Sequence, residues 1–200
     1  VLFANVLSVK QGLTPAYYTS SAFTTPIDAS NYNAGSVYCN WNASGYRLPS
    51  EGEWEYIARA GTFGPFSVNE PAYSLSTYNQ CTAGLLPVLE GVAWFCGNAS
   101  GTTHPVGLKT SNPWNFKDIH GNVNELVWDV HHAYPVTAQI NYQYPNVGVG
   151  VGVTDTPVIR GGDWEYQAVY ARSAYRDHLT SGTVGDRDVG FRLVRTLTTP

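Results

Sequence analysis

The sequence predicts an α+β fold in which two short helices precede a series of short strands joined by long irregular loops. Helical signals occur only in the first 61 of the 200 residues. Beyond Gly61, short runs of β-forming residues alternate with Gly, Pro and Asn turns. A chain of this length has enough residues to bury one core, so we expect a single domain over residues 1–200. Helices followed by strands indicate separate helical and sheet layers.

The first helix is expected at residues 1–11. Its apolar residues Leu2, Val6 and Val9 would face inward, and Gly12 would end it.

The second helix has the clearer signal, at residues 51–60. Ser50 is expected to cap its first turn, with Glu53 as the reciprocal partner in a capping box. Gly61 would end it, and its inner face would carry Trp54, Ile57 and Ala58.

Four short runs rich in β-forming residues are expected to be strands, because turn residues bound them. They are residues 92–96, 123–128, 158–160 and 191–194. Residues 147–153 alternate Gly and Val. Since glycine weakens strand register and packing, we interpret that stretch as a flexible insertion without chemistry.

The composition argues against two classes of function. Only 13% of residues are charged and the net charge is −4, so the chain lacks the basic stripe that nucleic acid requires. No apolar run approaches membrane-spanning length, so no span is expected. Fourteen Tyr and six Trp are the unusual component. Tyrosine combines a large contact area with a polar tip, which suits recognition surfaces.

The three cysteines cannot all pair with one another. Cys81 and Cys96 have room to join, which would leave Cys39 free. Buried free thiols are the interpretation we favour, because no Cys or His spacing indicates zinc.

The C-terminal segment, residues 160–194, combines residues that specify a backbone with residues of unrestricted type between them. The first group is a Gly-Gly turn, large rings and arginines: Arg160, Gly161, Gly162, Trp164, Arg172, Arg176, Gly190, Phe191 and Arg192. The residues between them follow no apolar period, so packing does not dictate their types. We therefore interpret them as outward-facing residues of a binding surface, held by a scaffold in which Trp164 and Phe191 are buried.

Two groups of residues have types that metals prefer. Residues 121–125 offer turn carbonyls and a carboxylate, which calcium takes as ligands, but five residues supply too few ligands by themselves. The alternative is that Asn122 caps a turn and Glu125 accepts backbone hydrogen bonds. His120, His131 and His132 lack the spacing of a transition-metal site, and we expect an ordinary surface pair at 131–132.

Several ordered motifs resemble the formylglycine-generating enzyme (sulfatase-modifying factor) family. They are YRLPSEGEWEYIARAG at 46–61, THPVG at 103–107, NPWNFKDIHGNVNE at 112–125, RGGDW at 160–164 and GFR at 190–192. The resemblance covers about residues 1–195. It implies a C-type-lectin-like fold: a small twisted antiparallel sheet, two helices and much irregular loop. The family's usual N-terminal strands are missing before Val1, from which we expect a truncated chain.

Departures from the family pattern bear on function. Family enzymes carry copper and oxidise their substrate through a pair of cysteines after the Arg-Gly-Gly turn. Residues 163–176 contain no cysteine, and copper(I) needs thiolate ligands, so this chemistry should be absent. The middle block usually reads Gly-Asn-Val-Trp-Glu-Trp, and here Asn124 and Leu126 replace both tryptophans. The resemblance implies a calcium site at Gly121, Asn122, Val123 and Glu125, because these residues keep the backbone and carboxylate ligands of the family in type.

The end of the chain also resembles the variable region of proteins diversified by diversity-generating retroelements. In that group, adenines of a template repeat are randomised on copying into a C-terminal lectin-like domain. Asn codons of the AAC type, or AAG- and AAA-like codons, would yield the variable residues proposed here: Asp163, Glu165, Tyr166, Gln167, Val169, Tyr170, Tyr175, Asp177, His178, Leu179, Thr183, Val184, Gly185 and Asp188.

This resemblance predicts a non-catalytic receptor or display protein that requires no cofactor. Its shallow, aromatic and locally acidic surface would bind an external ligand, by preference a protein, that presents Arg, Lys or apolar groups. His178 would make binding sensitive to pH. The alternatives are a formylglycine-generating-type oxidase or related enzyme, a calcium-dependent lectin, and a structural domain of a larger surface protein. Cell surface, virion and cytoplasm all remain open as locations.

Overall fold

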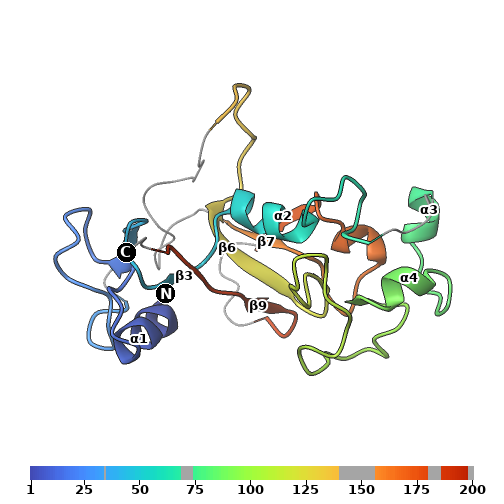
Figure 1. The fold of residues 1–200 in the computed structure, drawn as a ribbon, viewed down its shortest axis with the longest axis horizontal. Coiled ribbons are helices and arrows are strands. Elements are labelled where there is room, and N and C mark those ends of the chain that lie inside the picture. Colours follow the sequence, from blue (N-terminus) through green and yellow to red (C-terminus); the bar gives the residue numbers. More distant parts are fainter. Residues whose placement is uncertain (34, 69–73, 140–155, 180–185, 198–200) are drawn as a thin grey trace.

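The computed structural model describes residues 1–33, 35–68, 74–139, 156–179 and 186–197. Figure 1 shows helix α1 (Leu2–Lys10) at one end of the molecule, with both chain termini beside it. Helices α3 (Leu75–Tyr78) and α4 (Pro87–Glu90) lie at the other end, and helix α2 (Glu51–Arg59) lies over a sheet in the middle. The expected α+β class is confirmed.

The sheet between these ends has four strands in the order β8-β7-β6-β9. They are β8 (Arg176–His178), β7 (Pro157–Arg160), β6 (Asn124–Val130) and β9 (Val189–Phe191). Three are antiparallel neighbours, but β9 pairs with β6 in parallel. The sheet is therefore mixed, and the antiparallel expectation is wrong for this pair. Strands β8 and β9 are the two edge strands, on opposite sides of the sheet.

Three two-stranded pairs and one short helix complete the secondary structure of the described residues. β1 (Tyr17–Tyr18) pairs with β2 (Tyr38–Cys39), and β3 (Tyr46–Arg47) pairs with β10 (Val194–Arg195). β4 (Ala93–Trp94) pairs in parallel with β5 (His120–Gly121), and a 3₁₀ helix, η1, spans Ala168–Ala171. The run expected at 191–194 is divided between β9 and β10. The Gly-Val stretch at 147–153 lies outside the described residues.

Helix α2 forms as expected. The Ser50 hydroxyl accepts from the Glu53 backbone N–H at 3.2 Å, and the Glu53 carboxylate accepts from the Ser50 N–H at 2.8 Å. Ala60 adopts a left-handed φ of 46° and ends the helix before Gly61. Trp54 and Ala58 are fully buried and pack with Ile119, Val127 and Val158 against the sheet. The capping box and the inner face are therefore confirmed.

Helix α1 forms, but its buried side is not the one expected. Val6 and Val9 are 54% and 64% exposed, while Asn5 and Ser8 are buried. The Asn5 amide donates to two backbone carbonyls and accepts from the Tyr17 N–H at 3.0 Å. The Ser8 hydroxyl accepts from the Tyr46 N–H at 2.8 Å. Pairing of backbone groups from neighbouring segments thus decides which side of this helix is buried.

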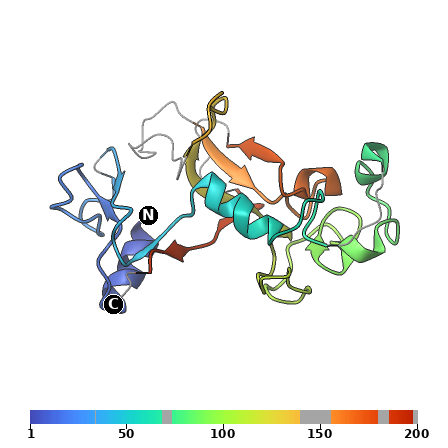
Figure 2. The same cartoon turned by 45° about the horizontal axis from the view of Figure 1, so that its top comes forward.

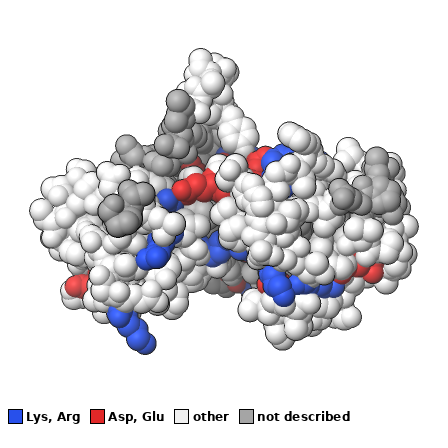
Figure 3. All heavy atoms as spheres, in the orientation of Figure 1, with Lys and Arg blue, Asp and Glu red and all other residues white. Residues whose placement is uncertain are grey.

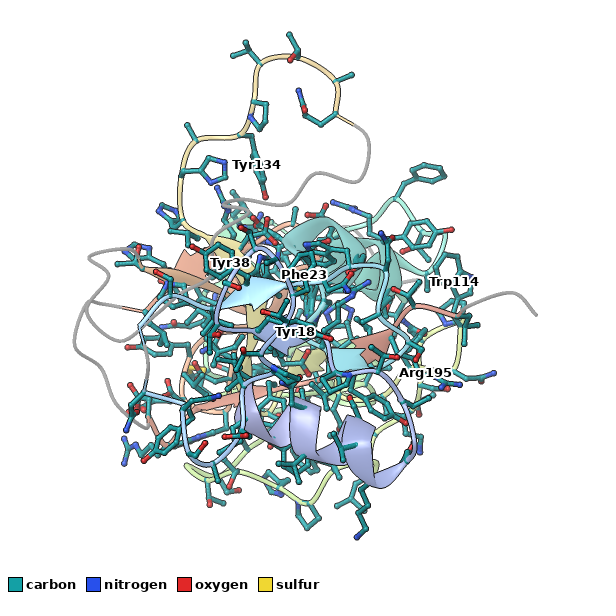
Figure 4. All side chains as sticks on the ribbon, turned by 90° about the vertical axis from the view of Figure 1, so that its left-hand side faces the viewer. Tyr18, Phe23, Tyr38, Trp114, Tyr134 and Arg195 are labelled. Carbon is teal, nitrogen blue, oxygen red and sulfur yellow. A yellow bond between two sulfur atoms is a disulfide. The ribbon has the colours of Figure 1, made fainter. Side chains whose placement is uncertain are left out.

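An aromatic cluster holds the N-terminal segment to the sheet. Tyr17 stacks on Trp128 with ring centroids 5.3 Å apart, and Trp41 meets Trp128 edge-on at 6.1 Å. Figure 4 looks onto this end of the molecule and shows Tyr18, Phe23 and Tyr38 on the nearer side. The buried thiol of Cys39 lies in the same cluster.

A second cluster joins η1 to the α3–α4 end, around Phe66, Leu89 and Phe95. A disulfide between Cys81 and Cys96 closes this region. Free thiols, the interpretation favoured from sequence, are therefore wrong for these two cysteines and confirmed only for Cys39. Helix α4 and strand β4 lie between these cysteines, and the chain returns so that their Cα atoms are 5.0 Å apart, within disulfide reach.

The Gly161-Gly162 turn after β7 requires glycine at both positions. Their φ values are +95° and +68°. A Cβ on Gly162 would lie 2.9 Å from the Ala171 Cα, and one on Gly161 would lie 3.0 Å from the Ile119 carbonyl oxygen. The turn therefore seats β7 against η1 at van der Waals distance, as only a residue without a side chain can.

Replacing Gly162 with alanine should lower stability by roughly 2–3 kcal/mol, because the substitution combines left-handed strain with a backbone clash. Thermal denaturation should show a drop of roughly 5–10 °C. Gly52→Ala is the control, since a Cβ there meets nothing within 4 Å in helix α2. It should be neutral or stabilising by up to about 1 kcal/mol. Equal melting temperatures for the two variants would contradict this account of the turn.

His120 is a buried polar group at the centre of the fold. Its Nδ1 donates to the Ala171 carbonyl at 2.8 Å, and its Nε2 accepts from the Ser67 N–H at 3.2 Å. Burial lowers the pKa of His120 to about 4.

The neutral ring of His120 should make stability fall in acid. Its contribution is complete above about pH 6.5, the unfolded pKa, and is lost as pH falls towards the folded value, since only the unfolded chain gains the proton. The loss is roughly 3 kcal/mol. Urea denaturation at pH 7 and pH 4.5 measures it. His120→Asn should have a lower free energy of unfolding at pH 7, and that free energy should change less between pH 7 and pH 4.5. An equal change with pH in the two proteins would contradict the assignment.

Candidate ligand-binding site

Arginines fix the C-terminal strands to helix α2 on one face of the sheet. Arg160 on β7 is fully buried and donates to the Glu55 carboxylate at 2.6 Å and to the Ser173 carbonyl at 2.8 Å. It also donates to the Tyr175 carbonyl. Arg176, its register partner on β8, binds the Glu51 carboxylate through two nitrogens at 2.7 and 2.8 Å.

The face of the sheet that points away from helix α2 carries a different set of side chains. Side chains alternate between faces along a strand. Because Glu125, Val158 and Arg160 contact α2, their neighbours Asn124 and Ile159 point the other way. Asn124 pairs in register with Val189 of β9, and Ile159 pairs with Asp177 of β8. Strands β6, β7, β8 and β9 carry this face, and Figure 2 shows helix α2 lying across these strands.

A hollow of about 340 Å³ opens on that second face. We call it the C-terminal hollow. Four strands and the loops beside them contribute its lining: Asn124, Ile159, Asp163, Tyr166, Tyr170, Tyr175, Asp177, His178, Leu179, Asp186, Asp188 and Val189. The structure thus brings together most of the residues proposed as variable, from segments up to 25 positions apart (163 to 188).

Three tyrosines form a continuous wall of the hollow. Tyr166 meets Tyr170 edge-on with ring centroids 5.6 Å apart, and Tyr170 meets Tyr175 in the same way at 5.0 Å. The Tyr175 hydroxyl donates to the Asp177 carboxylate at 3.0 Å. Burial, and then the charge of Asp177, raise the pKa of Tyr175. Tyr166 is 51% exposed at the rim.

Asp163 corrects the expectation that the variable side chains face water. It is only 2% exposed. One carboxylate oxygen accepts from the backbone N–H groups of Glu165 and Tyr166, at 2.7 and 3.0 Å, and the other accepts from the Asn124 amide at 2.6 Å. Burial raises its pKa. Asp163 therefore holds the turn that presents Tyr166, because a carboxylate can accept from both N–H groups at once.

Other proposed variable residues lie away from the hollow. Glu165 pairs with Arg187 at 3.0 Å in solvent. Val169 packs against the cluster around Phe66, so it also is not free of the core. Gln167 precedes η1 and is half-buried. Thr183, Val184 and Gly185 lie outside the described residues.

The scaffold residues behave as expected except for Phe191. Trp164 is 7% exposed, but Phe191 is 50% exposed and meets Phe3 edge-on, with ring centroids 5.8 Å apart. It is the last residue of the edge strand β9, where a side chain is less covered than in the middle of a sheet. Arg172 donates to the Val169 carbonyl at 2.7 Å and closes η1. Gly190 fits tightly, since a Cβ would lie 3.0 Å from Val123.

Asn124, Ile159 and Val189 also line the hollow, and the variable-residue pattern did not identify them. Ile159 and Val189 carry no sequence signal beyond membership of a strand. Asn124 does carry one, because it replaces a tryptophan of the family's middle block. The smaller side chain leaves the floor of the hollow open and reaches Asp163.

The block proposed for calcium is occupied by other contacts. The Glu125 carboxylate accepts from Arg192 through two nitrogens, each at 2.5 Å, and from the Trp54 indole at 2.7 Å. The Asn122 amide is paired with the backbone of His104, and the carbonyls of Gly121 and Asn122 accept the N–H groups of Val123 and Trp164. These residues therefore do not fit calcium as they are arranged, because the Glu125 carboxylate is already paired.

The cysteines do not fit the copper chemistry of the family enzymes either. Cys81 and Cys96 are joined, and burial raises the pKa of Cys39 to about 12. No pair of thiolates is present for copper(I).

The three histidines also lie apart. His120 is in the core, His131 stacks on His178 with ring centroids 4.3 Å apart, and His132 Nδ1 lies 2.9 Å from the Val130 carbonyl. His131 is exposed and His132 is half-buried, as an ordinary surface pair would be, and His178 is the ring that stacks on His131. Within the described ranges, no three His, Cys, Asp or Glu side chains are placed to hold a metal.

A larger hollow, of about 680 Å³, lies between α2 and the loop at 131–139. Figure 4 shows Tyr134 at the base of this projecting loop. The tyrosine hydroxyl donates to Glu51 at 2.8 Å, and Arg176 lies over its ring at 4.2 Å. Glu53 and Glu55 are bound by arginines as well. Because the carboxylates of this larger hollow are already paired, we regard it as a weaker candidate for ligand binding than the C-terminal hollow.

The fold, with the C-terminal hollow on one face of its sheet, can now be compared with known families. The chain belongs to the sulfatase-modifying factor enzyme 1-like family, whose domain matches residues 9–197. This confirms the resemblance to formylglycine-generating enzymes and the C-type-lectin-like α+β fold that it implied.

Among curated relatives, chaperone protein LppX of Paenibacillus barcinonensis is 30% identical over 96% of this chain and 65% of its own length. The formylglycine-generating enzyme of Mus musculus is 33% identical over 56% of this chain and 30% of its length. The chain therefore spans less than two thirds of these relatives.

Among solved structures, Treponema denticola variable protein 1 superposes with a TM-score of 0.72 and 28% identity. The match covers 96% of this chain and 66% of that one. CarF superposes with a TM-score of 0.65 and 25% identity, over 98% of this chain and 64% of that one. In the described part of the chain, no helix has the length and apolar character to cross a membrane.

The paired state of Glu125 predicts the outcome of a calcium test. Glu125→Gln should lower stability by about 3–5 kcal/mol, because Arg192 loses its buried partner. Adding 1 mM calcium should leave the melting temperature of the unaltered protein unchanged. Glu165→Gln is the matched control, since its ion pair with Arg187 is exposed and should be worth less than about 1 kcal/mol. A calcium-induced rise in melting temperature that Glu125→Gln abolishes would restore the calcium proposal.

Proposed function

We propose that this chain is a non-catalytic ligand-binding domain whose C-terminal hollow is diversified by a retroelement. The observation that carries the proposal is that most of the residues proposed as variable line one hollow. They lie on the face of the sheet that the buried arginines do not use. The similarity to a protein named for variability supports it.

The division between the two faces makes substitution in the hollow tolerable. Arg160 and Arg176 fix β7 and β8 from the α2 side whatever the other side carries. Surface substitutions usually change stability by within about 0.5 kcal/mol. Half-buried Tyr170 and Tyr175 should cost more than that, and Asp163 most of all, because it holds backbone groups.

The cysteines argue against the oxidase alternative. Copper chemistry needs a thiolate pair, and here one pair is closed in a disulfide while the third thiol is buried. The other alternative, a structural domain of a larger surface protein, predicts that nothing enters the hollow. The binding experiment below distinguishes it.

A displayed library of random peptides should yield ligands that depend on the tyrosine wall. Ligands selected on the unaltered protein should bind Tyr166→Asn at least about tenfold more weakly, since aromatic residues supply much of the energy of interfaces. Tyr32→Asn is the control, because Tyr32 is exposed to a similar extent, 53% against 51%, and does not line the hollow. Melting temperatures of both variants should stay within a few degrees of the original. Selected ligands that tolerate Tyr166→Asn and also other changes in the lining would contradict the proposal.

Diversification is tested on DNA. The flanking region should encode a reverse transcriptase and carry a near-identical repeat. The repeat and the gene should differ only at template adenines, in codons for the proposed variable residues. A flanking region without such a repeat would remove retroelement diversification from the proposal and leave the binding role standing.

A further inference from the structure

The C-terminal hollow is negatively charged. Its lining includes four aspartates and, among the described residues, no lysine or arginine: the aspartates are Asp163, Asp177, Asp186 and Asp188. Arg187, next in the chain, is directed elsewhere. It pairs with Glu165 at 3.0 Å and lies over the Trp164 ring at 5.0 Å. Only 13% of the residues are charged, and white surface predominates on the face drawn in Figure 3, so a concentration of four carboxylates is unusual for this chain.

The four carboxylates differ in the contacts that they already make. Both oxygens of Asp163 accept hydrogen bonds, as described above. Asp177 accepts from the Tyr175 hydroxyl and from the His178 N–H at 2.8 Å. Asp188 differs, because its Oδ1 is shielded from water and has no hydrogen-bond partner in the described part of the chain. A buried oxygen left without a donor is costly, and in native proteins it usually indicates a missing partner.

The electrostatic state of Asp188 is consistent with a missing cation. Burial, followed by a hydrogen bond with Asp186 and the charges of Asp163 and Asp186, raises the pKa of Asp188 to about 6. A positive group within about 4–6 Å would favour its charged form and reverse this effect. The walls suit such a group too, since tyrosine faces attract lysine and arginine.

We propose that the C-terminal hollow binds one arginine or lysine side chain of a protein ligand, with Asp188 as its anionic partner and the tyrosine wall around it. This proposal rests on the proposed binding function and specifies the ligand group. A cationic side chain supplies the donor that Asp188 Oδ1 lacks and offsets the repulsion among the carboxylates.

Binding should weaken in acid, because a proton on Asp188 competes with the cation. The titratable groups around Asp188 come from several elements: Asp163 after β7, Asp177 and His178 on β8, Asp186 beside it, and the tyrosines Tyr166, Tyr170 and Tyr175. His131 stacks on His178, and the Arg187 backbone N–H donates to Asp186 at 2.9 Å while its guanidinium pairs with Glu165. Protonation of Asp188 removes the negative charge that would pair with a cation, so acid disfavours cation binding.

The test uses the peptide Gly-Gly-Arg-Gly-Gly with blocked ends, and the same peptide with citrulline in place of arginine. Citrulline keeps the shape but is neutral. Backbone amide NMR signals of Asn124, Tyr166 and Asp188 report binding. We expect the arginine peptide to shift these signals and to bind at least about tenfold more tightly than the citrulline peptide. A change from pH 7.5 to pH 5 should weaken it about tenfold, as the carboxylate fraction falls.

Asp188→Asn should abolish this difference between the two peptides. The variant should fold, because the backbone carbonyl of Asp188, not its side chain, accepts from the Asn124 N–H. Asp28→Asn, an equal change of charge on an exposed loop outside the hollow, should bind as the original does. Putrescine distinguishes a free diamine from a protein side chain, and we expect it to bind more weakly than the arginine peptide.

Equal binding of arginine and citrulline peptides, unchanged binding by Asp188→Asn, or no shift at millimolar arginine peptide would overturn this inference. Putrescine binding more tightly than the peptide would overturn the assignment to a protein. If library-selected ligands still require Tyr166 in any of those cases, the binding function stands and only the cationic ligand fails. If those ligands tolerate every change in the lining while arginine binds through Asp188, the proposed function fails and the cation site stands.

Discussion

The buried ion pair between Arg160 and Glu55 is the contact on which the arrangement of the C-terminal segment depends. One guanidinium joins helix α2 to strand β7 and also binds two carbonyls of the segment that leads into β8. Buried pairs of this kind fix geometry more than they add net stability, and removing one partner typically costs about 3–5 kcal/mol. The position of β8, and with it one wall of the hollow, is therefore set from the far side of the sheet.

This arrangement separates the residues that hold the fold from the residues that meet a ligand. Arg160, Arg176 and Glu125 act on the α2 face. Asn124, Ile159 and Asp177 act on the other. Asp163 is the exception, because it lines the hollow and also holds a turn. A diversified family built on this scaffold would then be expected to retain an acceptor at position 163 while Tyr166 or Leu179 changes.

Local signals in the sequence were the reliable ones. The capping box of Ser50 and Glu53 predicts α2 because all of its contacts lie within four residues. The gaps between arginines and glycines identify most of the hollow, because a residue type that packing does not restrict is free to serve recognition.

Long-range contacts explain what sequence reasoning missed. The buried side of α1 is decided by Asn5 and Ser8, whose partners lie 12 to 38 positions away, so an apolar period misplaces it. Apolar periodicity does not show which strands pair or in which direction. The parallel pairing of β9 with β6 could therefore not be predicted from it. Phe191 was expected inside because large rings usually are, yet its strand is at an edge. Val169 and Asp163 follow no apolar periodicity, yet Val169 packs against the core and Asp163 holds backbone groups. A residue outside the periodic pattern can therefore still have a structural role.

The lone thiol of Cys39 has a practical consequence. It is 5% exposed in the cluster beneath the N-terminal helix, burial raises its pKa to about 12, and the other two cysteines of the chain are joined to each other. An alkylating reagent added to the native protein thus finds no accessible sulfhydryl. The rate at which the reagent modifies Cys39 therefore measures how often the N-terminal end opens transiently. Mass spectrometry can follow this rate without any engineered label.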